Sequence, residues 1–182
     1  MKSRILCLLL IASTLAACTD DVDSLYTRES AFFRYNLVAT TQPLRAALTS
    51  AGEWCRITFS NGKQYHFENA HGQTYDYMPT AVSQYGDHTC ICGFVVGTPA
   101  VPDMSGQTVV AYDAACPECY RESYIQSTLT FASSSTMHCN RCGTTYDLNN
   151  SGCPTSGDAT NAMLRYRYVT YSEANNTLVI QN

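Results

Sequence analysis

Short apolar and aromatic segments, separated by turn residues, follow one another along the chain from residue 31 onward. No long stretch repeats with a helical period, and only residues 44–48, ahead of Gly52, fit a short helix. The other segments are rich in β-branched and aromatic residues, as strands are. They are residues 33–38, 55–59, 64–67, 94–96, 109–112, 124–131, 136–139, 144–148, 164–171 and 178–180. The pattern predicts an all-β domain over residues 31–182, built as a small barrel or a sandwich.

Two turn sequences predict how neighbouring strands pair. Asn61-Gly62 stands between two such segments, and both residues tolerate the positive φ of a tight hairpin turn. Near the end of the chain, the alternating segment 164–171 is followed by Asn175-Asn176 and a last apolar segment. We therefore expect one hairpin around Asn61-Gly62 and a second at the C-terminus.

The first eighteen residues have the pattern of an export signal. Lys2 and Arg4 precede the apolar residues 5–11, and the segment closes on Leu15-Ala16-Ala17-Cys18. This ending resembles the bacterial lipobox, which implies cleavage before Cys18 and lipidation of its thiol. Residues 1–17 are then a lipoprotein signal peptide, and the protein is anchored to a membrane through its N-terminal lipid.

We expect residues 18–30, which begin with the lipidated Cys18, to form an acidic tether. Their acidic start, Thr19-Asp20-Asp21-Val22-Asp23, has no pattern that buries apolar surface. It resembles the acidic signal that sends lipoproteins of the Bacteroides group to the cell surface, and a plain solvated spacer is the alternative. The expected location is the outer membrane of a bacterium, with the domain exposed on the cell surface under the first interpretation.

The charge of the chain argues against one class of binding partner, and its composition is that of a folded domain. The formal net charge is −4, and loss of Lys2 and Arg4 with the signal makes it −6, which argues against nucleic acid as a partner. At 45% hydrophobic residues the chain can form a core. No Arg-Arg pair precedes the apolar run, which indicates the general secretion route and therefore export as an unfolded chain.

The most specific signal lies in the cysteines. Cys116-Pro-Glu-Cys119 and Cys139-Asn-Arg-Cys142 are two C-x2-C elements with nineteen residues between them, a spacing typical of a four-thiolate metal site. Two intervening residues let one tight turn direct both sulfurs at a common point about 2.3 Å away. A strand, a serine-rich turn and a return strand between the elements predict a hairpin that brings them together. Gly143 suits the positive φ of such a turn.

Two disulfides are the alternative, because exported proteins meet an oxidising environment. The remaining cysteines, Cys55, Cys90, Cys92 and Cys153, form bridges or buried thiols, and their pairing stays open. The acids nearest the thiolates, Asp113, Glu118 and Asp147, form no obvious acid–base pair. The sequence also contains no Gly-rich phosphate loop, no Gly-x-Ser-x-Gly and no His-Glu-x-x-His. We expect a protein that is not an enzyme, or at most an electron-transfer component of an oxidoreductase system.

The region from Val110 onward resembles the Rieske ferredoxin domain. The resemblance rests on Ala111-Tyr-Asp-Ala-Ala-Cys-Pro-Glu-Cys119, on Cys139-Asn-Arg-Cys-Gly-Thr-Thr-Tyr-Asp-Leu-Asn-Asn-Ser-Gly152, on Pro154-Thr-Ser-Gly157, and on the final hairpin segments. In that family the second loop reads C-x2-H-G-x-x-F/Y-D-x3-G, a Pro/Gly segment follows, and a last hairpin ends the domain. The same region also resembles a group of Bacteroides-type lipoproteins with a Rieske-like fold. The resemblance implies a small β barrel with an inserted subdomain and two metal-binding loops, here residues 113–120 and 138–157.

The loops depart from the family at the ligands. A Rieske cluster needs C-x-H and C-x2-H, whereas here the first loop is one residue longer and Cys142 stands where a histidine is expected. The high-potential cluster is therefore not supported. Zn²⁺ is the cofactor we expect, since zinc needs no assembly machinery and suits closed four-thiolate sites. A single iron or an all-thiolate [2Fe–2S] cluster is the alternative.

Three functions follow from these alternatives. In the first, Cys116, Cys119, Cys139 and Cys142 hold a structural zinc ion in a lipid-anchored surface binding or interaction module. In the second, the same thiolates hold iron in an electron-transfer protein with a redox partner. In the third, disulfides replace the metal and the domain is a scaffold.

Overall fold

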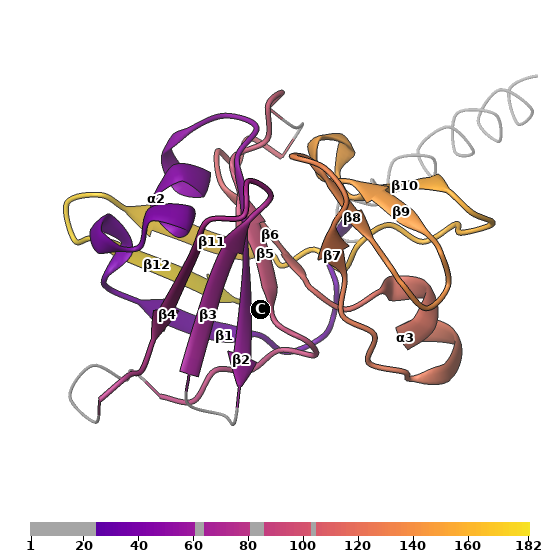
Figure 1. Ribbon diagram of the computed structural model, residues 1–182, viewed down its shortest axis with the longest axis horizontal. Coiled ribbons are helices and arrows are strands. Elements are labelled where there is room, and N and C mark those ends of the chain that lie inside the picture. Colours follow the sequence, from indigo (N-terminus) through magenta and orange to yellow (C-terminus); the bar gives the residue numbers. More distant parts are fainter. Residues whose placement is uncertain (1–24, 61–63, 81–85, 103–104) are drawn as a thin grey trace, which may run out of the picture.

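The computed structural model describes residues 25–60, 64–80, 86–102 and 105–182. This part of the chain forms three antiparallel sheets and two short α-helices, so the predicted all-β class is confirmed (Figure 1). The predicted signal peptide and the lipidated Cys18 lie outside the described residues. None of the helices in the described ranges has the length and apolar character needed to cross a membrane.

The largest sheet has five strands. Their order is β4 (Thr74–Tyr77), β3 (Gln64–Asn69), β2 (Trp54–Ser60), β5 (Phe94–Gly97) and β6 (Val110–Asp113). Strands β2 and β3 pair antiparallel with Ser60 opposite Gln64, so the hairpin predicted around Asn61-Gly62 is confirmed, although its turn lies outside the described residues. The edge strand β4 was not predicted.

The second sheet joins the beginning of the described chain to its end. Its order is β1 (Phe32–Tyr35), β12 (Thr177–Gln181) and β11 (Tyr168–Ser172). The predicted C-terminal hairpin is confirmed, with Ser172 opposite Thr177. The predicted strand 164–171 begins four residues too early, because residues 164–167 cross between sheets, with Arg165 bridged to Tyr112 of β6.

Helix α2 (Gln42–Thr49) confirms the short helix expected at residues 44–48. Pro43 occupies its first turn, where its fixed φ is favourable, and the helix follows the 3₁₀ turn η2 (Val38–Thr40). The helix buries Leu44, Ala47 and Leu48 against the five-stranded sheet. This turn and helix end the predicted strand 33–38 at Tyr35.

The third sheet belongs to a segment inserted between β6 and β11. Its order is β10 (Cys153–Ser156), β9 (Thr145–Asp147), β8 (Thr136–His138) and β7 (Thr130–Phe131), and it is accompanied by α3 (Pro117–Ser123) and the 3₁₀ turn η3 (Leu148–Asn150). The strand predicted at 124–131 is wrong over most of its length. Helix α3 ends at Tyr124, which lies in the left-handed region with φ of 53°. The residues that follow it hydrogen-bond to the chain before the helix, with Cys116 N–H donating to Ser127 O and Leu129 N–H donating to Ala114 O. Only Thr130–Phe131 remain as a strand.

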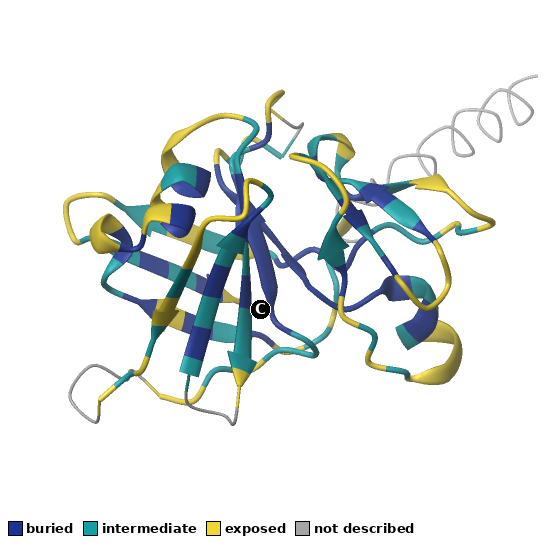
Figure 2. Cartoon of the chain, viewed as in Figure 1, coloured by how far each residue is buried: buried dark blue, intermediate teal, exposed yellow. Residues whose placement is uncertain are grey.

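Two hydrophobic clusters lie on opposite faces of the five-stranded sheet, whose strands β5 and β6 are buried along their whole length (Figure 2). Strands β5 and β6 are buried on both faces, since Phe94 and Val96 belong to the first cluster and Val95 to the second. We call the part around the first cluster the barrel lobe (the five-stranded and three-stranded sheets with α2). We call residues 114–163 the cysteine lobe. The five-stranded sheet therefore separates the two lobes and contributes side chains to the core of each.

The predicted tether, residues 18–30, includes six described residues at its end. They lie against the domain, since Thr27 N–H donates to Arg165 O at 2.8 Å and the Asn182 side chain donates to Thr27 O and Glu29 O. The Tyr26 ring lies under the guanidinium groups of Arg165 and Arg167. The chain from Tyr26 onward is therefore part of the folded body.

Candidate metal centre

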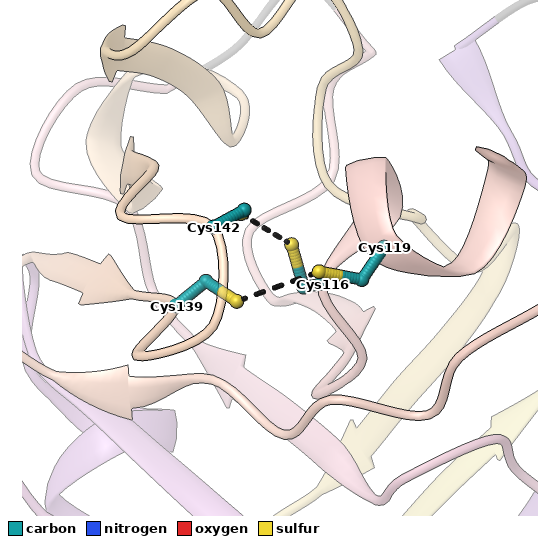
Figure 3. A group of neighbouring side chains, drawn as sticks. All are labelled: Cys116, Cys119, Cys139 and Cys142. Atoms are coloured by element: carbon teal, nitrogen blue, oxygen red, sulfur yellow. Dashed lines mark hydrogen bonds between the residues drawn. The ribbon is translucent and has the colours of Figure 1, made fainter. Parts of the chain in front are cut away.

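The fold brings together all four cysteines that the sequence singled out. The sulfurs of Cys116, Cys119, Cys139 and Cys142 all lie within 4.8 Å of one another (Figure 3). Across the two loops, Cys116 Sγ is 3.5 Å from Cys142 Sγ, and Cys119 Sγ is 3.8 Å from Cys139 Sγ. Four sulfurs about 2.3 Å from one tetrahedral ion are separated by about 3.8 Å. The cluster thus has the size of a coordination shell around a single ion.

The first pair is positioned by the start of α3. Cys116 is the residue before the helix, and its carbonyl accepts the N–H of Tyr120 at 3.0 Å. Cys119 follows in the first turn, so its sulfur lies on the same side, and its backbone N–H donates to the Cys116 sulfur. Cys116 N–H donates to Ser127 O at 2.8 Å, which fixes the loop to the segment that leads into β7.

The second pair is positioned by the turn between β8 and β9. Cys139 and Thr144 close this turn, with Cys139 N–H donating to Thr144 O and Gly143 N–H donating to Cys139 O, both at 2.9 Å. Gly143 has φ of 77°, and no atom lies within 4 Å of the place of a Cβ. The glycine is therefore required by backbone conformation and not by space, as the sequence predicted.

Three hydroxyl groups surround the sulfurs. Ser127 Oγ lies 3.4 Å from Cys139 Sγ, Tyr146 Oη 3.5 Å from Cys116 Sγ, and Thr144 Oγ1 3.3 Å from Cys142 Sγ. In metal sites, hydrogen bonds from neighbouring residues commonly orient the ligating side chains. Sequence reasoning did not identify these residues, because the sheet register and loop geometry bring them to the sulfurs.

The thiols differ in exposure and in pKa. Cys116 and Cys139 have no exposed surface and Cys119 has 8%, whereas Cys142 is exposed. Burial raises the pKa of Cys116 to about 11 against an opposing hydrogen bond from Cys119 N–H. Burial also opposes ionisation of Cys139. There the Ser127 hydroxyl and the N–H groups of Cys142 and Arg141 outweigh it, and the pKa falls to about 6. A bound cation would compensate the buried thiolate charge at this point.

The remaining four cysteines lie apart from this cluster. All eight described cysteines carry free thiols. Cys55 is fully buried in the barrel lobe, Cys90 packs against the same cluster, and Cys92 packs against the other one. Cys153 lines a surface hollow of about 200 Å³ beside Arg121 and Arg165. None of these four joins the group of possible ligands within the described residues.

Asp113 has a role that the sequence did not reveal. Its side chain is fully buried at the end of β6 and accepts the N–H groups of Ile91, Cys92 and Ala115 at 2.7–3.1 Å, together with the Tyr166 hydroxyl. Burial raises its pKa, and these four hydrogen bonds oppose that shift. Asp113 therefore joins three segments at the boundary of the two lobes rather than facing the thiols.

Glu118 anchors α3 to a distant segment. Its Oε1 accepts the backbone N–H groups of Thr160 and Asn161 and the side-chain amide of Asn161 at 2.8–3.0 Å. Asp147 accepts the N–H of Asn149 and caps η3. Asp113, Glu118 and Asp147, the acids nearest the cysteines, thus fix the backbone by accepting hydrogen bonds from its N–H groups.

Comparisons with protein families, with curated proteins and with solved structures found no match. The site is therefore defined by its own geometry. It is a four-cysteine cluster that can hold a metal ion, set in a β domain of three antiparallel sheets.

Proposed function

We propose that the protein is a lipid-anchored, exported domain whose cysteine lobe is held together by one zinc ion bound to Cys116, Cys119, Cys139 and Cys142. The observation that carries this proposal is the meeting of four sulfurs from two loops within 4.8 Å. Three of them are also members of the cysteine lobe's hydrophobic cluster. An ion there would replace apolar packing as the link between α3 and the hairpin β8–β9.

The sulfur positions favour one ion over a two-iron cluster. In a [2Fe–2S] cluster each iron takes two of the four protein sulfurs, and bridging sulfides separate the two pairs. Here the contacts of 3.5 and 3.8 Å run between the loops, and no sulfur lies beyond 4.8 Å from another. That spacing suits a single tetrahedral ion.

Zinc is favoured over a single iron by the predicted route of export. A chain that crosses the membrane unfolded acquires its metal afterwards, and zinc binds closed thiolate sites without assembly machinery or redox chemistry. The ion would supply folding free energy and no catalysis.

The arrangement of the lobes supports the proposed Rieske-like architecture. The cysteine lobe is inserted between β6 and the final hairpin β11–β12, and each of its two loops supplies two sulfurs. This matches the order that the resemblance implies, with cysteines in place of the cluster histidines. The anchor at Cys18, the acidic tether and the outer-membrane location complete the proposal, in which the domain is a surface module for interaction with a partner.

Electron transfer through a single iron is the second candidate. One observation favours it: the sulfurs of Cys116 and Cys139 accept backbone N–H groups, and hydrogen bonds to ligand sulfurs tune the potential of iron sites. The exposed Cys142 would be the exit for the electron.

Elemental analysis with a visible spectrum of purified protein tests the two candidates. One zinc per colourless chain supports the first, and one iron with charge-transfer bands supports the second. A protein without metal whose four cysteines are all disulfide-bonded would overturn both. The anchor is tested separately with Cys18→Ser, which should move the protein from the membrane fraction to the soluble fraction. An unchanged distribution would contradict lipidation.

A further inference from the structure

The four cysteines are not equally exposed. Cys116, Cys119 and Cys139 are buried, whereas Cys142 is exposed at the tip of the turn that precedes β9. Its neighbours in that turn, Asn140, Arg141 and Gly143, are exposed as well. In the zinc-loaded site all four sulfurs are thiolates, so exposure decides which of them reacts first, and a small oxidant in solvent meets Cys142 before the other three.

The sulfur contacts also indicate which sulfur would react next. Cys142 Sγ is 3.5 Å from Cys116 Sγ, while Cys119 Sγ and Cys139 Sγ form a second contact at 3.8 Å. Both contacts join one loop to the other, as Figure 3 shows. A disulfide needs the sulfurs at about 2.05 Å, so each pair must close by less than about 2 Å.

The two cross-loop pairs are compatible with each other. The pair Cys119–Cys139 lies within the pair Cys116–Cys142 along the chain, as successive rungs do in a hairpin. Bridges within each C-x2-C element would instead leave the loops unconnected. Cross-loop bridges would keep α3 attached to the hairpin β8–β9 in the same place as the ion does.

We propose that the cluster is a redox modification site at which peroxide oxidises Cys142 first, releases the zinc and converts the site to the disulfides Cys116–Cys142 and Cys119–Cys139. This inference rests on the proposed zinc site. The lobe would then have two folded forms, one closed by zinc and one closed by disulfides.

The chemistry balances with hydrogen peroxide as the oxidant. The Cys142 thiolate attacks one peroxide oxygen, the O–O bond breaks, and the products are a sulfenic acid and hydroxide. The Cys116 thiolate then attacks the Cys142 sulfur, an S–S bond forms, and a second hydroxide leaves. Each bridge thus transfers two electrons to one peroxide. The pair Cys119–Cys139 consumes a second peroxide, and the zinc ion leaves as its thiolate ligands are lost.

Peroxide titration of the protein as purified tests this order of events. Zinc content is measured first. Released zinc is then followed with a chromogenic chelator, a sulfenic-acid trap is added to a parallel sample, and disulfides are mapped by peptide mass spectrometry. We expect the trap on Cys142, full zinc release by two equivalents of peroxide, and both cross-loop bridges.

Two variants of the same chemical change sharpen the test. In Cys142→Ser, loaded with excess zinc, peroxide-driven zinc release should slow at least tenfold. Cys153→Ser, which alters a partly exposed thiol outside the cluster, should release zinc at the wild-type rate.

The failures can be told apart. Protein that carries no zinc before peroxide is added contradicts the proposed function, and with it this inference. Zinc-loaded protein that forms bridges within each C-x2-C element, or is first trapped at another cysteine, overturns the inference alone. Loss of zinc with Cys142 irreversibly oxidised and no bridge formed would overturn it as well.

Discussion

The two lobes share one sheet but are built on different means of stabilisation. The barrel lobe packs large side chains such as Phe33, Phe67 and Phe94 between strands of four to seven residues and helix α2. The cysteine lobe has strands of two to four residues, and three of its buried core members are cysteines. The first lobe therefore has a large apolar core, whereas the core of the second includes three cysteines, and under the proposed function its stability depends on the ion that the sulfurs bind.

The size of the cysteine lobe supports this difference. It spans residues 114–163, fifty residues in all. Segments of this size bury too little apolar surface for robust stability and commonly need a metal or disulfides. The cysteine lobe also packs against one face of the five-stranded sheet, and Trp54, Val95 and Tyr112 on that face complete its core.

Removing a buried ligand should have the largest effect and should be confined to one lobe. We expect Cys139→Ser to lose bound metal and to destabilise the cysteine lobe by more than about 3 kcal/mol, because a structural ion contributes folding free energy directly. Hydrogen exchange should then accelerate in residues 114–163 and stay slow in β2 and β3. Metal content and exchange, measured by mass spectrometry, check both parts.

Cys153→Ser is the matched control for that variant. It makes the same chemical change outside the four-sulfur cluster and should leave metal content and exchange near wild type. If Cys139→Ser kept its metal, or if both variants unfolded the barrel lobe, the proposal that bound metal stabilises only the cysteine lobe would be wrong.

Asp113→Asn should weaken the boundary between the lobes. All four of its hydrogen-bond partners act as donors, so one face of an asparagine amide would present N–H groups to N–H groups. We expect a loss of about 2–3 kcal/mol, the cost of leaving buried polar groups unsatisfied. Urea unfolding measures it. Asp147→Asn is the control and should be nearly neutral, because asparagine also caps helical turns well. Equal losses in the two variants would refute the special role of Asp113.

A pair of glycines separates metal binding from general stability. Gly143 and Gly72 have φ of 77° and 76°, and neither has an atom within 4 Å of the place of a Cβ. Alanine should therefore cost about 1 kcal/mol at either position through backbone strain. Only Gly143→Ala should also lower zinc affinity, because only Gly143 closes the turn that holds Cys139 and Cys142. A zinc-competition assay that found equal affinity in both variants would contradict this geometry.

The smallest effect is expected at the surface of α3. Glu118→Ala removes three hydrogen bonds to Thr160 and Asn161 and should cost about 1 kcal/mol, since these groups are partly exposed. Glu122→Ala, on the same helix and exposed, should cost less than about 0.5 kcal/mol. Thermal melts of the two variants provide the measurement, and indistinguishable midpoints would argue against the anchoring role.

The features that depend on nearby residues were predictable from the sequence. The C-x2-C spacing identified all four sulfurs, and the Asn61-Gly62 turn identified the hairpin β2–β3. Local pattern failed where tertiary packing decides. The segment 124–131 is rich in strand-forming residues, yet only Thr130–Phe131 form a strand, because residues 127–129 hydrogen-bond to residues 114–116 at the other end of α3. The strand β10 carries Pro154 and has no clear alternation that would identify it.

The roles of Asp113 and of the hydroxyls could not be predicted at all. Asp113 lies 53 residues from Tyr166 and 22 from Ile91 along the chain, and only the packing of sheets brings these groups together. Tyr146 lies 30 residues from Cys116 and reaches its sulfur through the register of β8 and β9. No local spacing encodes such contacts.

X-ray absorption spectroscopy at the metal edge is the sharpest test of the proposed four-cysteine zinc site. It identifies the element, the type and number of its ligands, and the bond lengths in the purified protein. We expect a zinc edge with four sulfur ligands at about 2.3 Å and no neighbouring metal. An iron edge, with or without a second iron close by, or nitrogen or oxygen ligands in place of the sulfurs, would show that the site is not a four-cysteine zinc site.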